Sequence, residues 1–411
     1  MKSTLEIPNF RHLLAIREAV RQESLAGAAR AINLSQPAVT QAVKRIETQA
    51  GAALFERHTT GMVPTGAGRL FATRIERALE FIAQAERTIG APAPLSRIAS
   101  TVQLRALIGV AETSSFSAAA RHLGLAQPSV HRAVRDLETL CGRPLVTRGA
   151  HGVAPTREAK MLSRSASLAF AEIRQGFEEV REQDGIMDGR LWIGSLPLAI
   201  SYPLPTAVTL LLESYPDANV RIVEGHYDEV LHELRHGALE VMIGALRDPA
   251  PAADIRQEKL FDDSLAIMVR ASHPLLTHPE PDAQALAALD WIAPREGTPA
   301  RRHFKNFFAA RGLPPPVHII ECSSLAAVRS LVMQSDRAAL LSEGQTHLEK
   351  HSGQLAVLKA RMPGTERAIG LTLRKDWRPT AMQATFLDIV RKLVREIDPL
   401  VPRVALRSDD D

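Results

Sequence analysis

The sequence has few cysteines and no long apolar run. Its two cysteines, Cys141 and Cys322, stand far apart in 411 residues, which argues against a disulfide scaffold and a thiolate zinc site. No apolar run approaches the ~18 residues that a membrane-spanning helix needs. The stretch MKSTLEIPNF lacks the apolar core of a signal peptide. We therefore expect a cytoplasmic protein without membrane association, built from two or three domains of ~150 residues.

Two motifs typical of enzymes are also missing. The chain has neither a Gly-x-Ser-x-Gly elbow nor a Gly-x-x-x-x-Gly-Lys-Ser/Thr phosphate loop. The pairs His232/His236 and His347/His351 have an i, i+4 spacing that could hold a metal, but such pairs are more often surface histidines. We expect a protein that is not an enzyme and that has no cofactor and no bound metal.

Charge is divided unevenly along the chain. Residues 1–185 carry 24 basic and 17 acidic side chains, a net charge of +7, whereas residues 186–411 carry a net charge of −3. A basic amino-terminal part suits a polyanionic partner, although a solvated helical surface would show the same excess.

An internal repeat is the most informative feature. Residues 24–65 align without gaps with residues 115–156 at an offset of 91, with 18 identities in 42 positions. In the second copy, an i, i+3, i+4, i+7 apolar stripe from Leu104 to Ala111 predicts a helix with one buried face. A turn at Gly124 then precedes a third helix. Each copy is therefore predicted to be a helix-turn-helix module.

The third helix of each copy places polar side chains opposite its apolar stripe. Such donors and acceptors suit base edges and phosphates in a major groove. One solvated surface helix would look alike, but here the pattern occurs twice, with Gln-Pro at both starts. The candidate DNA-binding residues are Gln36, Pro37, Thr40, Gln41 and Lys44 in the first copy, and Gln127, Pro128, Ser129, His131, Arg132 and Arg135 in the second.

A turn-rich stretch follows each third helix and predicts a β-hairpin wing. Arg57 and Arg148 would then lie near phosphates, with a plain surface charge as the alternative. Apolar residues in 66–90 and 157–185 next recur with heptad spacing and predict two linker helices. Each heptad seam is short and Gly176 weakens the second, so packing within one chain stays open beside packing between chains.

These segments resemble the winged helix-turn-helix of LysR-type transcriptional regulators. The resemblance spans about sixty residues, twice, and rests on FSAAA at 116–120, QPAVT at 36–40, LFER at 54–57 and TGAG at 65–68. Most of that family has one such head, so the tandem arrangement is a departure that leaves open which copy binds DNA. The first copy keeps the wing pattern better. The second has the better Ser-Phe-x-x-Ala-Ala segment, but His131 stands where the family usually has serine.

The rest of the chain alternates short strands with helical stretches. This pattern predicts an α/β domain with parallel sheets in two lobes, and it resembles the effector-binding domain of LysR-type regulators, which has the fold of periplasmic binding proteins. The expected organisation is a first head at 1–65, a first linker helix at 66–90, a Pro-rich spacer at 91–100, a second head at 101–156, a second linker helix at 157–185, an effector domain at 186–400 with lobe I at 189–265 and 366–400 and lobe II at 266–365, and a tail at 401–411.

The resemblance also implies a ligand between the two lobes. Ser195 ends a predicted strand and precedes a predicted helix, where free amides and a hydroxyl can hold an anionic or polar group. A serine that caps its own helix is the alternative. A sugar or a small carboxylic acid is the expected ligand class. Position matching to the family gives the candidate residues Ser195, Leu196, Pro197 and Leu198 in the first lobe and Arg295, Thr298 and Ser323 in the second.

Together these features predict a ligand-responsive transcription factor. It is expected to bind double-stranded DNA as a homodimer or homotetramer and to contact RNA polymerase. A nonspecific architectural DNA-binding protein is the alternative, because basic heads bind any duplex through its phosphates. A transport-type binding protein would share the carboxyl-terminal fold but not the basic heads. The effector, the operator and the direction of regulation stay open.

Overall fold

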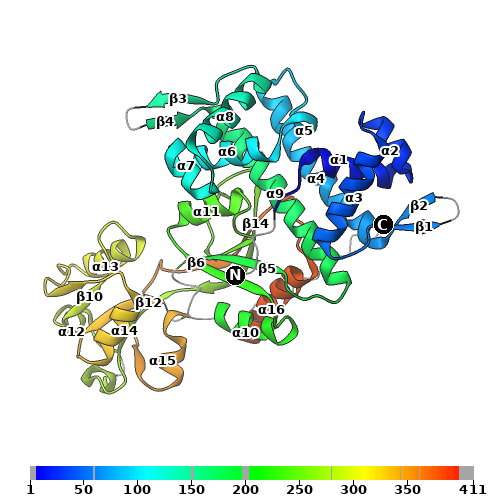
Figure 1. The fold of residues 1–411 in the computed structure, drawn as a ribbon. Helices are drawn as coiled ribbons and strands as arrows, with labels where there is room; N and C mark the ends of the chain where they lie inside the picture. Colours follow the sequence, from blue (N-terminus) through cyan, green and yellow to red (C-terminus); the bar gives the residue numbers. More distant parts are fainter. Residues whose placement is uncertain are drawn as a thin grey trace.

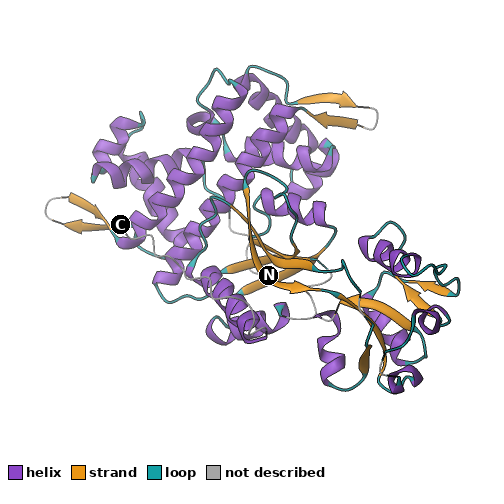
Figure 2. Ribbon diagram, turned by 180° about the vertical axis from the view of Figure 1, so that it is seen from behind, coloured by secondary structure: helices purple, strands orange, loops and turns teal. Residues whose placement is uncertain are grey.

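The computed structural model describes residues 6–58, 61–149, 152–196, 203–278, 280–342, 344–360 and 362–397. Two helical heads occupy one side of the molecule and two α/β lobes the other (Figure 1). The same arrangement is visible from behind, where strands are confined to the lobes and to two projecting hairpins (Figure 2). Within the described ranges, every helix is too short or too polar to cross a membrane.

Local capping fixes the helices of the first head. Side-chain oxygens of Asn9, Ser24 and Ser35 accept backbone amides at the three helix starts, as capping residues do. Pro37 sits in the first turn of the third helix, where its missing amide is tolerated. The elements are α1 (Phe10–Gln22), α2 (Leu25–Ala31), α3 (Gln36–Ala50), β1 (Phe55–His58) and β2 (Gly61–Pro64).

The second head repeats this order. Ser100 and Gln103 form a capping box at the start of its first long helix. Gly124 ends the next helix in the left-handed conformation at φ 65°, which glycine adopts without steric cost. Both copies therefore contain the predicted helix-turn-helix and hairpin. The elements are α5 (Leu95–Ile98), α6 (Thr101–Thr113), α7 (Phe116–Leu123), α8 (Gln127–Cys141), β3 (Val146–Gly149) and β4 (Gly152–Pro155).

The two linker helices, α4 (Gly66–Ile89) and α9 (Arg157–Gln183), pack along each other within one chain. They run antiparallel, because Phe71 lies against Phe177 and the later Arg77 pairs with the earlier Glu172. The sequence left open whether the heptad seams pack within one chain or between chains. The structure shows them packed within one chain. Gly176 also has a packing role, since a Cβ there would lie 2.8 Å from the Phe71 ring.

Lobe I contains a five-stranded sheet in the order β6-β5-β7-β14-β8. Strand β5 is parallel to β6 and β7, and β14 is antiparallel to both of its neighbours. Helices α10 and α16 share one hydrophobic core with this sheet. The elements are β5 (Arg190–Ser195), α10 (Leu204–Ser214), β6 (Asn219–Glu224), α11 (Tyr227–Arg235), β7 (Val241–Ala245), β8 (Ile255–Asp263), β14 (Arg367–Arg374) and α16 (Ala381–Ile397).

Lobe II contains a second such sheet, in the order β11-β10-β12-β9-β13. Trp291 anchors one face, with its ring 5.0 Å from Phe304 and 5.8 Å from Phe308. The elements are β9 (Leu265–Arg270), η1 (Pro274–Thr277), α12 (Ala283–Ala287), β10 (Trp291–Ala293), α13 (Pro299–Ala309), β11 (Ile319–Glu321), α14 (Leu325–Met333), β12 (Ala338–Ser342), η2 (Gly344–Thr346), α15 (His347–His351) and β13 (Leu355–Leu358).

One expectation about the sheets was wrong, and one strand was missed. The sheets are mixed rather than parallel, because the chain passes between the lobes twice and the strands after these crossings, β9 and β14, run against their neighbours. Strand β8 was not predicted. It is an edge strand whose exposed positions carry charges such as Arg256 and Lys259, so it lacks the apolar run that marks the other strands.

Candidate nucleic-acid interface and ligand-binding lobes

Helix α3 exposes all the candidate residues of the first copy, Gln36, Pro37, Thr40, Gln41 and Lys44, while Val39, Val43 and Ile46 are buried. The Thr40 hydroxyl donates to the Gln36 carbonyl at 3.0 Å. Within the described residues, no hydrogen bond or ion pair occupies the side chains of Gln36, Gln41 and Lys44. These polar groups are therefore available to a partner.

Helix α8 exposes the corresponding face of the second copy, with Gln127, Pro128, Ser129, His131, Arg132 and Arg135 all at the surface. Ser117 donates to Oε1 of Gln127 at 2.9 Å and leaves the Gln127 amide group free to donate. The ring of Phe116 lies 5.0 Å from that of His131 and limits its orientation. The sequence indicated neither supporting contact, since Phe116 and Ser117 stood out only through the family resemblance.

Each hairpin wing is fixed to its recognition helix, α3 or α8, by one glutamate. Oε1 of Glu47 accepts the amides of Leu54 and Phe55 at 2.8 and 3.2 Å. Glu138 makes the same pair of contacts in the second copy, at the same two distances. These glutamates were not predicted to have a role, although their identity between the two copies was a signal.

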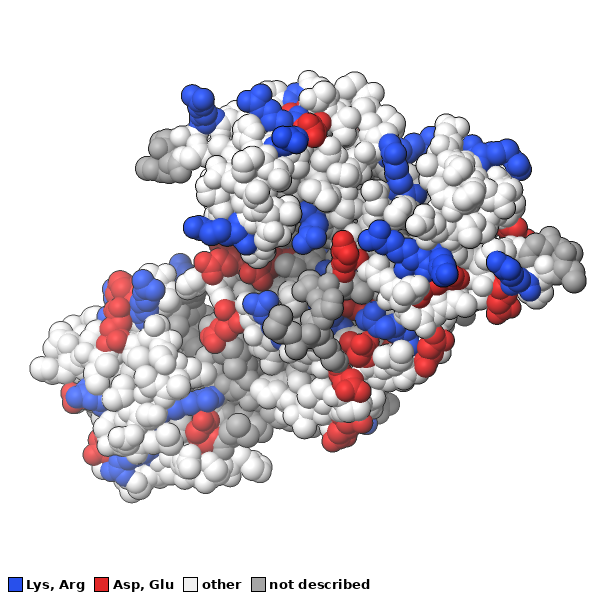
Figure 3. All heavy atoms as spheres, viewed as in Figure 1, with Lys and Arg blue, Asp and Glu red and all other residues white. Residues whose placement is uncertain are grey.

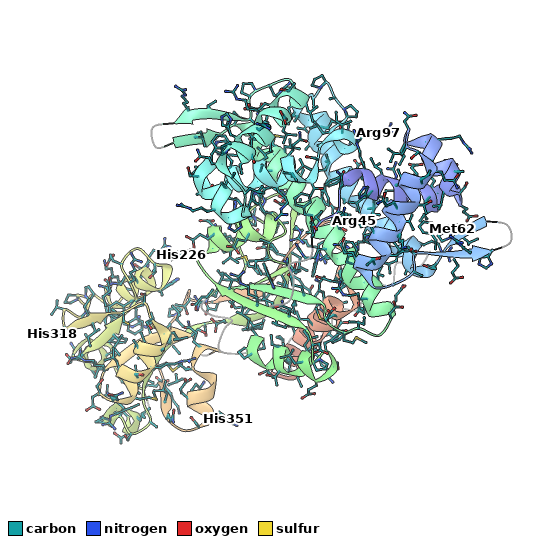
Figure 4. The ribbon with its side chains drawn as sticks, viewed as in Figure 1. Arg45, Met62, Arg97, His226, His318 and His351 are labelled. Atoms are coloured by element: carbon teal, nitrogen blue, oxygen red, sulfur yellow. The ribbon has the colours of Figure 1, made fainter. Side chains whose placement is uncertain are left out.

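The wings carry the two candidate arginines outward. Arg57 on β1 and Arg148 on β3 are exposed, and neither forms an ion pair with a described residue. Figure 4 labels Met62 on the first wing, far from His318 and His351 in lobe II.

On the face shown in Figure 3, Lys and Arg side chains are spread over both heads with few acidic side chains among them. The exposed surface of the heads thus suits a polyanion.

A buried charge cluster joins the linker helices to lobe I. Arg74 on α4 donates to Glu172 at 2.8 Å and to Glu179 at 2.9 Å, both on α9, and to the Arg378 carbonyl at 3.0 Å. Burial opposes the charge on Arg74, but its hydrogen bonds with Glu179 and the charge of Glu172 leave its pKa raised. This cluster ties α4, α9 and lobe I into one unit.

A second buried carboxyl lies on α9 where that helix meets lobe I. Burial raises the pKa of Glu178 to about 7, and the charge of Arg174 opposes this rise while that of Glu240 adds to it. The positive charges of Arg190 and Arg181 also oppose it. Because this pKa in the folded state exceeds the ordinary value of 4.5, Glu178 stays protonated in the folded protein up to near neutral pH.

The raised pKa of Glu178 makes the free energy of unfolding depend on pH. Between about pH 4.5 and 7 the folded state holds a proton that the unfolded state has lost, so stability falls as the pH rises. Glutamine cannot take up or release this proton. We therefore expect Glu178→Gln to avoid about 2–3 kcal/mol of the stability that the wild type loses between pH 5 and pH 8. Denaturant unfolding at pH 5 and pH 8 should show the variant gaining stability relative to wild type at the higher pH. The exposed Glu76→Gln is the control, and an equal pH response of all three proteins would contradict the assignment.

In lobe I, the first candidate ligand residues are buried. Ser195 is fully buried at the end of β5 and its hydroxyl donates to the Leu196 carbonyl at 3.2 Å. Leu196 is also buried. A helix capped by Ser195 would begin at residues that lie outside the described part of the chain. Pro197 and Leu198 lie outside the described residues.

In lobe II, the other candidates share one edge of the sheet. Arg295 and Thr298 follow β10 and Ser323 follows β11, and these two strands are parallel neighbours. Thr298 caps α13, since its hydroxyl oxygen accepts the Arg301 amide at 3.2 Å and donates to the Arg295 carbonyl at 2.7 Å. Arg295 and Ser323 are exposed. The structure thus places the three lobe II residues at one edge of the sheet. Within the described chain, no hydrogen bond or ion pair links them to Ser195.

One buried carboxylate spans the crossing between the lobes. Asp263, at the end of β8, accepts from Ser342 of lobe II at 2.7 Å and pairs with Arg367 of β14 at 3.0 Å. Next to it, the Thr365 hydroxyl accepts the Leu265 amide at 3.2 Å. The sequence pattern did not identify Asp263. A change in the spacing of the lobes would therefore alter the contacts of Asp263 with Ser342 and Arg367.

The run from His232 to His236 has the His-Glu-x-x-His spacing of zinc proteases, yet its geometry does not suit a metal. The two histidine rings lie 3.9 Å apart, and Nδ1 of His236 is 2.8 Å from the His232 carbonyl. Burial lowers the pKa of His236 to about 4. Among the described residues, no group of three or more potential ligands is placed to hold a metal.

Comparison with protein families agrees with this architecture. Residues 10–69 and 101–160 each match the bacterial regulatory helix-turn-helix protein, lysR family, and residues 185–395 match the LysR substrate binding domain. The chain belongs to the LysR family of transcriptional regulators. This LysR protein carries two heads ahead of one effector domain. The family consists of regulators rather than enzymes.

Individual relatives agree with the family assignment. The HTH-type transcriptional regulator GalR of Pseudomonas putida is 32% identical over 396 residues, covering 95% of this chain and 99% of that protein, so the alignment includes both heads. The regulator PcaQ of Agrobacterium fabrum is 27% identical over 294 residues, covering 72% of this chain and 94% of that protein. A full-length OxyR variant from Pseudomonas aeruginosa shares the fold at 21% identity, with a TM-score of 0.50 over 72% of this chain and 94% of that one.

Proposed function

We propose that this LysR protein is a sequence-specific regulator that acts on double-stranded DNA in the cytoplasm and answers a small polar or carboxylate metabolite. The exposed polar faces of α3 and α8 carry this proposal, because each lies on the third helix of its head beside a wing and exposes polar side chains that suit base edges. The residues assigned to DNA are those exposed on these two faces, together with Arg57 and Arg148.

The effector is proposed to bind between the lobes and to act by population shift. The exposed Arg295 and Ser323 supply a positive charge and a hydroxyl on the lobe II edge, and Ser195 marks the corresponding strand end of lobe I. A ligand that favours one lobe spacing stabilises that spacing. Lobe I rests on α9 through Arg164, which donates to the Arg235 carbonyl at 3.2 Å, so a change in the lobes can reach the heads.

Assembly into a homodimer or homotetramer is part of the proposal. The α4 and α9 seam is already filled within the chain, so further contacts must use other surfaces. Leu212 on α10 and Ile222 on β6 are exposed apolar side chains of lobe I, 36% and 43% accessible, and they suit such a contact. Contact with RNA polymerase is expected of the DNA-bound protein.

Competition binding tests the proposal against the architectural alternative. A labelled duplex containing a site selected by the full chain is displaced by unlabelled copies of itself and by random duplex at physiological salt. A specific regulator should prefer its site by roughly 10³-fold or more. Equal displacement by both competitors would support a nonspecific architectural protein instead.

Salt dependence should identify the phosphate contacts. The logarithm of affinity falls by about 0.9 per phosphate contacted for each unit in the logarithm of salt concentration. We expect Lys44→Ala and Arg135→Ala each to reduce the magnitude of this slope by about 0.9, the value for one phosphate contact. Arg302→Ala, at an exposed arginine of lobe II, is the matched control and should leave the slope unchanged. An unchanged slope in Lys44→Ala or Arg135→Ala would remove that residue from the phosphate contacts.

Thermal-shift screening of the full chain against sugars and carboxylic acids tests the effector site. A ligand at 100 times its Kd stabilises the form it binds by about 2.7 kcal/mol, which raises the melting temperature. Arg295→Ala and Ser323→Ala should abolish the shift, whereas Arg302→Ala should keep it. A shift that survives both site substitutions would place the ligand elsewhere.

A further inference from the structure

The two heads are related by an approximate twofold rotation within one chain. At the 91-residue offset, α4 corresponds to the start of α9, and these equivalent helices pack antiparallel. Antiparallel packing of two copies of one helix places the attached units on opposite sides of a local twofold axis. Accordingly, the hairpins β1–β2 and β3–β4 project in opposite directions in both ribbon views (Figures 1 and 2).

This pairing is complete without a second chain. The heptad residues of both linker helices are buried in the single chain, at 0–3% exposure for the apolar side chains, namely Phe71, Ile75, Ala78, Ile82, Ala85, Ile89, Leu162, Ala166, Ala169, Ile173 and Val180. The Phe71 and Phe177 rings lie 4.7 Å apart. Arg74 then adds buried ion pairs across the same contact. One chain therefore holds two heads in a fixed relation.

The local symmetry is broken on the faces that would meet DNA. Along the recognition helices, Gln41 corresponds to Arg132 and Thr40 to His131 at the repeat offset. Glutamine suits the N6 and N7 edge of adenine, whereas arginine suits the O6 and N7 edge of guanine. Charge is also reversed one residue after the basic pair Lys44/Arg135, where Arg45 corresponds to Asp136.

Side-chain support differs between the heads as well. Ser117 fixes Gln127, and Phe116 supports His131. The equivalent positions in the first head are Ala26 and Leu25, which cannot hydrogen-bond to or stack on a neighbour in this way. The two helices thus present different donor patterns at equivalent places.

We propose that one chain binds one operator through both heads and that this operator is not palindromic, with one half-site for α3 and an unlike half-site for α8. Operator symmetry mirrors protein symmetry, so a local twofold with unlike faces demands two unlike half-sites about one helical turn, or a multiple of it, apart. This inference rests on the proposed function and adds the class of DNA sequence that the heads recognise.

Selection of binding sites from a random duplex library by the full chain tests the inference. Wild type should enrich two unlike half-sites at fixed spacing. Gln41→Ala should relax the sequence of one half-site only and Arg132→Ala that of the other, while the exposed controls Gln84→Ala and Arg302→Ala should reproduce the wild-type site. A wild-type site whose half-sites are all alike, or one variant that relaxes both kinds of half-site, would overturn the inference but leave the proposed function intact.

A second measurement needs no altered protein. Two duplexes are made from the selected site, each with one half-site duplicated as an inverted repeat. Wild type should bind both at least about 10-fold more weakly than the selected site, since each mismatched base pair costs roughly 5- to 150-fold in affinity. Equal or tighter binding of a symmetrised duplex would contradict the inference. A wild-type chain that enriches no sequence at all would overturn the proposed function, and the inference with it.

Discussion

Replacing Phe71 by alanine should lower the free energy of unfolding by about 3–5 kcal/mol, as removal of a large buried aromatic side chain does. Phe71 is fully buried, its ring lies 4.7 Å from that of Phe177, and Gly176 lets the two helices approach closely at this point. The loss should appear in denaturant unfolding followed by helical circular dichroism. Operator affinity should fall with it, because the seam fixes the relation between the heads.

Phe81→Ala is the matched control on the same helix. Phe81 is half-buried at the edge of the seam, so the same change of side chain should cost clearly less. A cost for Phe71→Ala below about 1 kcal/mol would fall within the range of a surface substitution. That result would mean that α4 and α9 do not pair as described.

Arg74→Met should also cost about 3–5 kcal/mol, because it removes one partner from a buried ion-pair cluster. Methionine keeps much of the apolar stem but leaves Glu179 without its guanidinium, whereas Glu172 keeps Arg77 at 3.0 Å. The free energy of unfolding from denaturant titration checks this.

The control is Arg87→Met, on the same helix and with the same change of side chain. The ion pair of Arg87 with Glu80 is 61% and 64% exposed, and pairs of this kind contribute less than about 1 kcal/mol. Equal losses in the two variants would show that burial of Arg74 adds nothing to the pairing of α4 with α9.

The heads were predictable from the sequence because their signals are local. Helix caps such as Ser35, the turn at Gly124 and the repeat itself act over a few residues, and the structure contains all of them. The heptad spacing also marked the buried face of α4. It could not name the partner, since an equivalent helix of another chain would satisfy the same apolar pattern as α9.

Contacts between distant residues escaped prediction. Arg74 meets Glu172 and Glu179 about 100 residues later in the chain, and no local pattern marks such a pairing. The same applies to Asp263, whose partners Ser342 and Arg367 belong to segments that come together only when the two lobes form.

The lobes show the same division between local and long-range information. Runs rich in β-branched residues marked the buried strands, but the charged edge strand β8 gave no such signal. The direction of β9 and β14 depends on the two crossings between the lobes, which alternation of strands and helices does not encode. For the same reason Ser195 and the lobe II candidates could be assigned to strand ends but not to a common site.

Hydroxyl-radical footprinting of the full chain on its selected operator tests the central claim most directly. The account predicts two protected segments, about one helical turn or a multiple of it apart. Gln36→Ala should weaken protection of one segment and Gln127→Ala that of the other. A footprint that neither substitution changes would contradict the assignment of α3 and α8 as the helices that bind DNA.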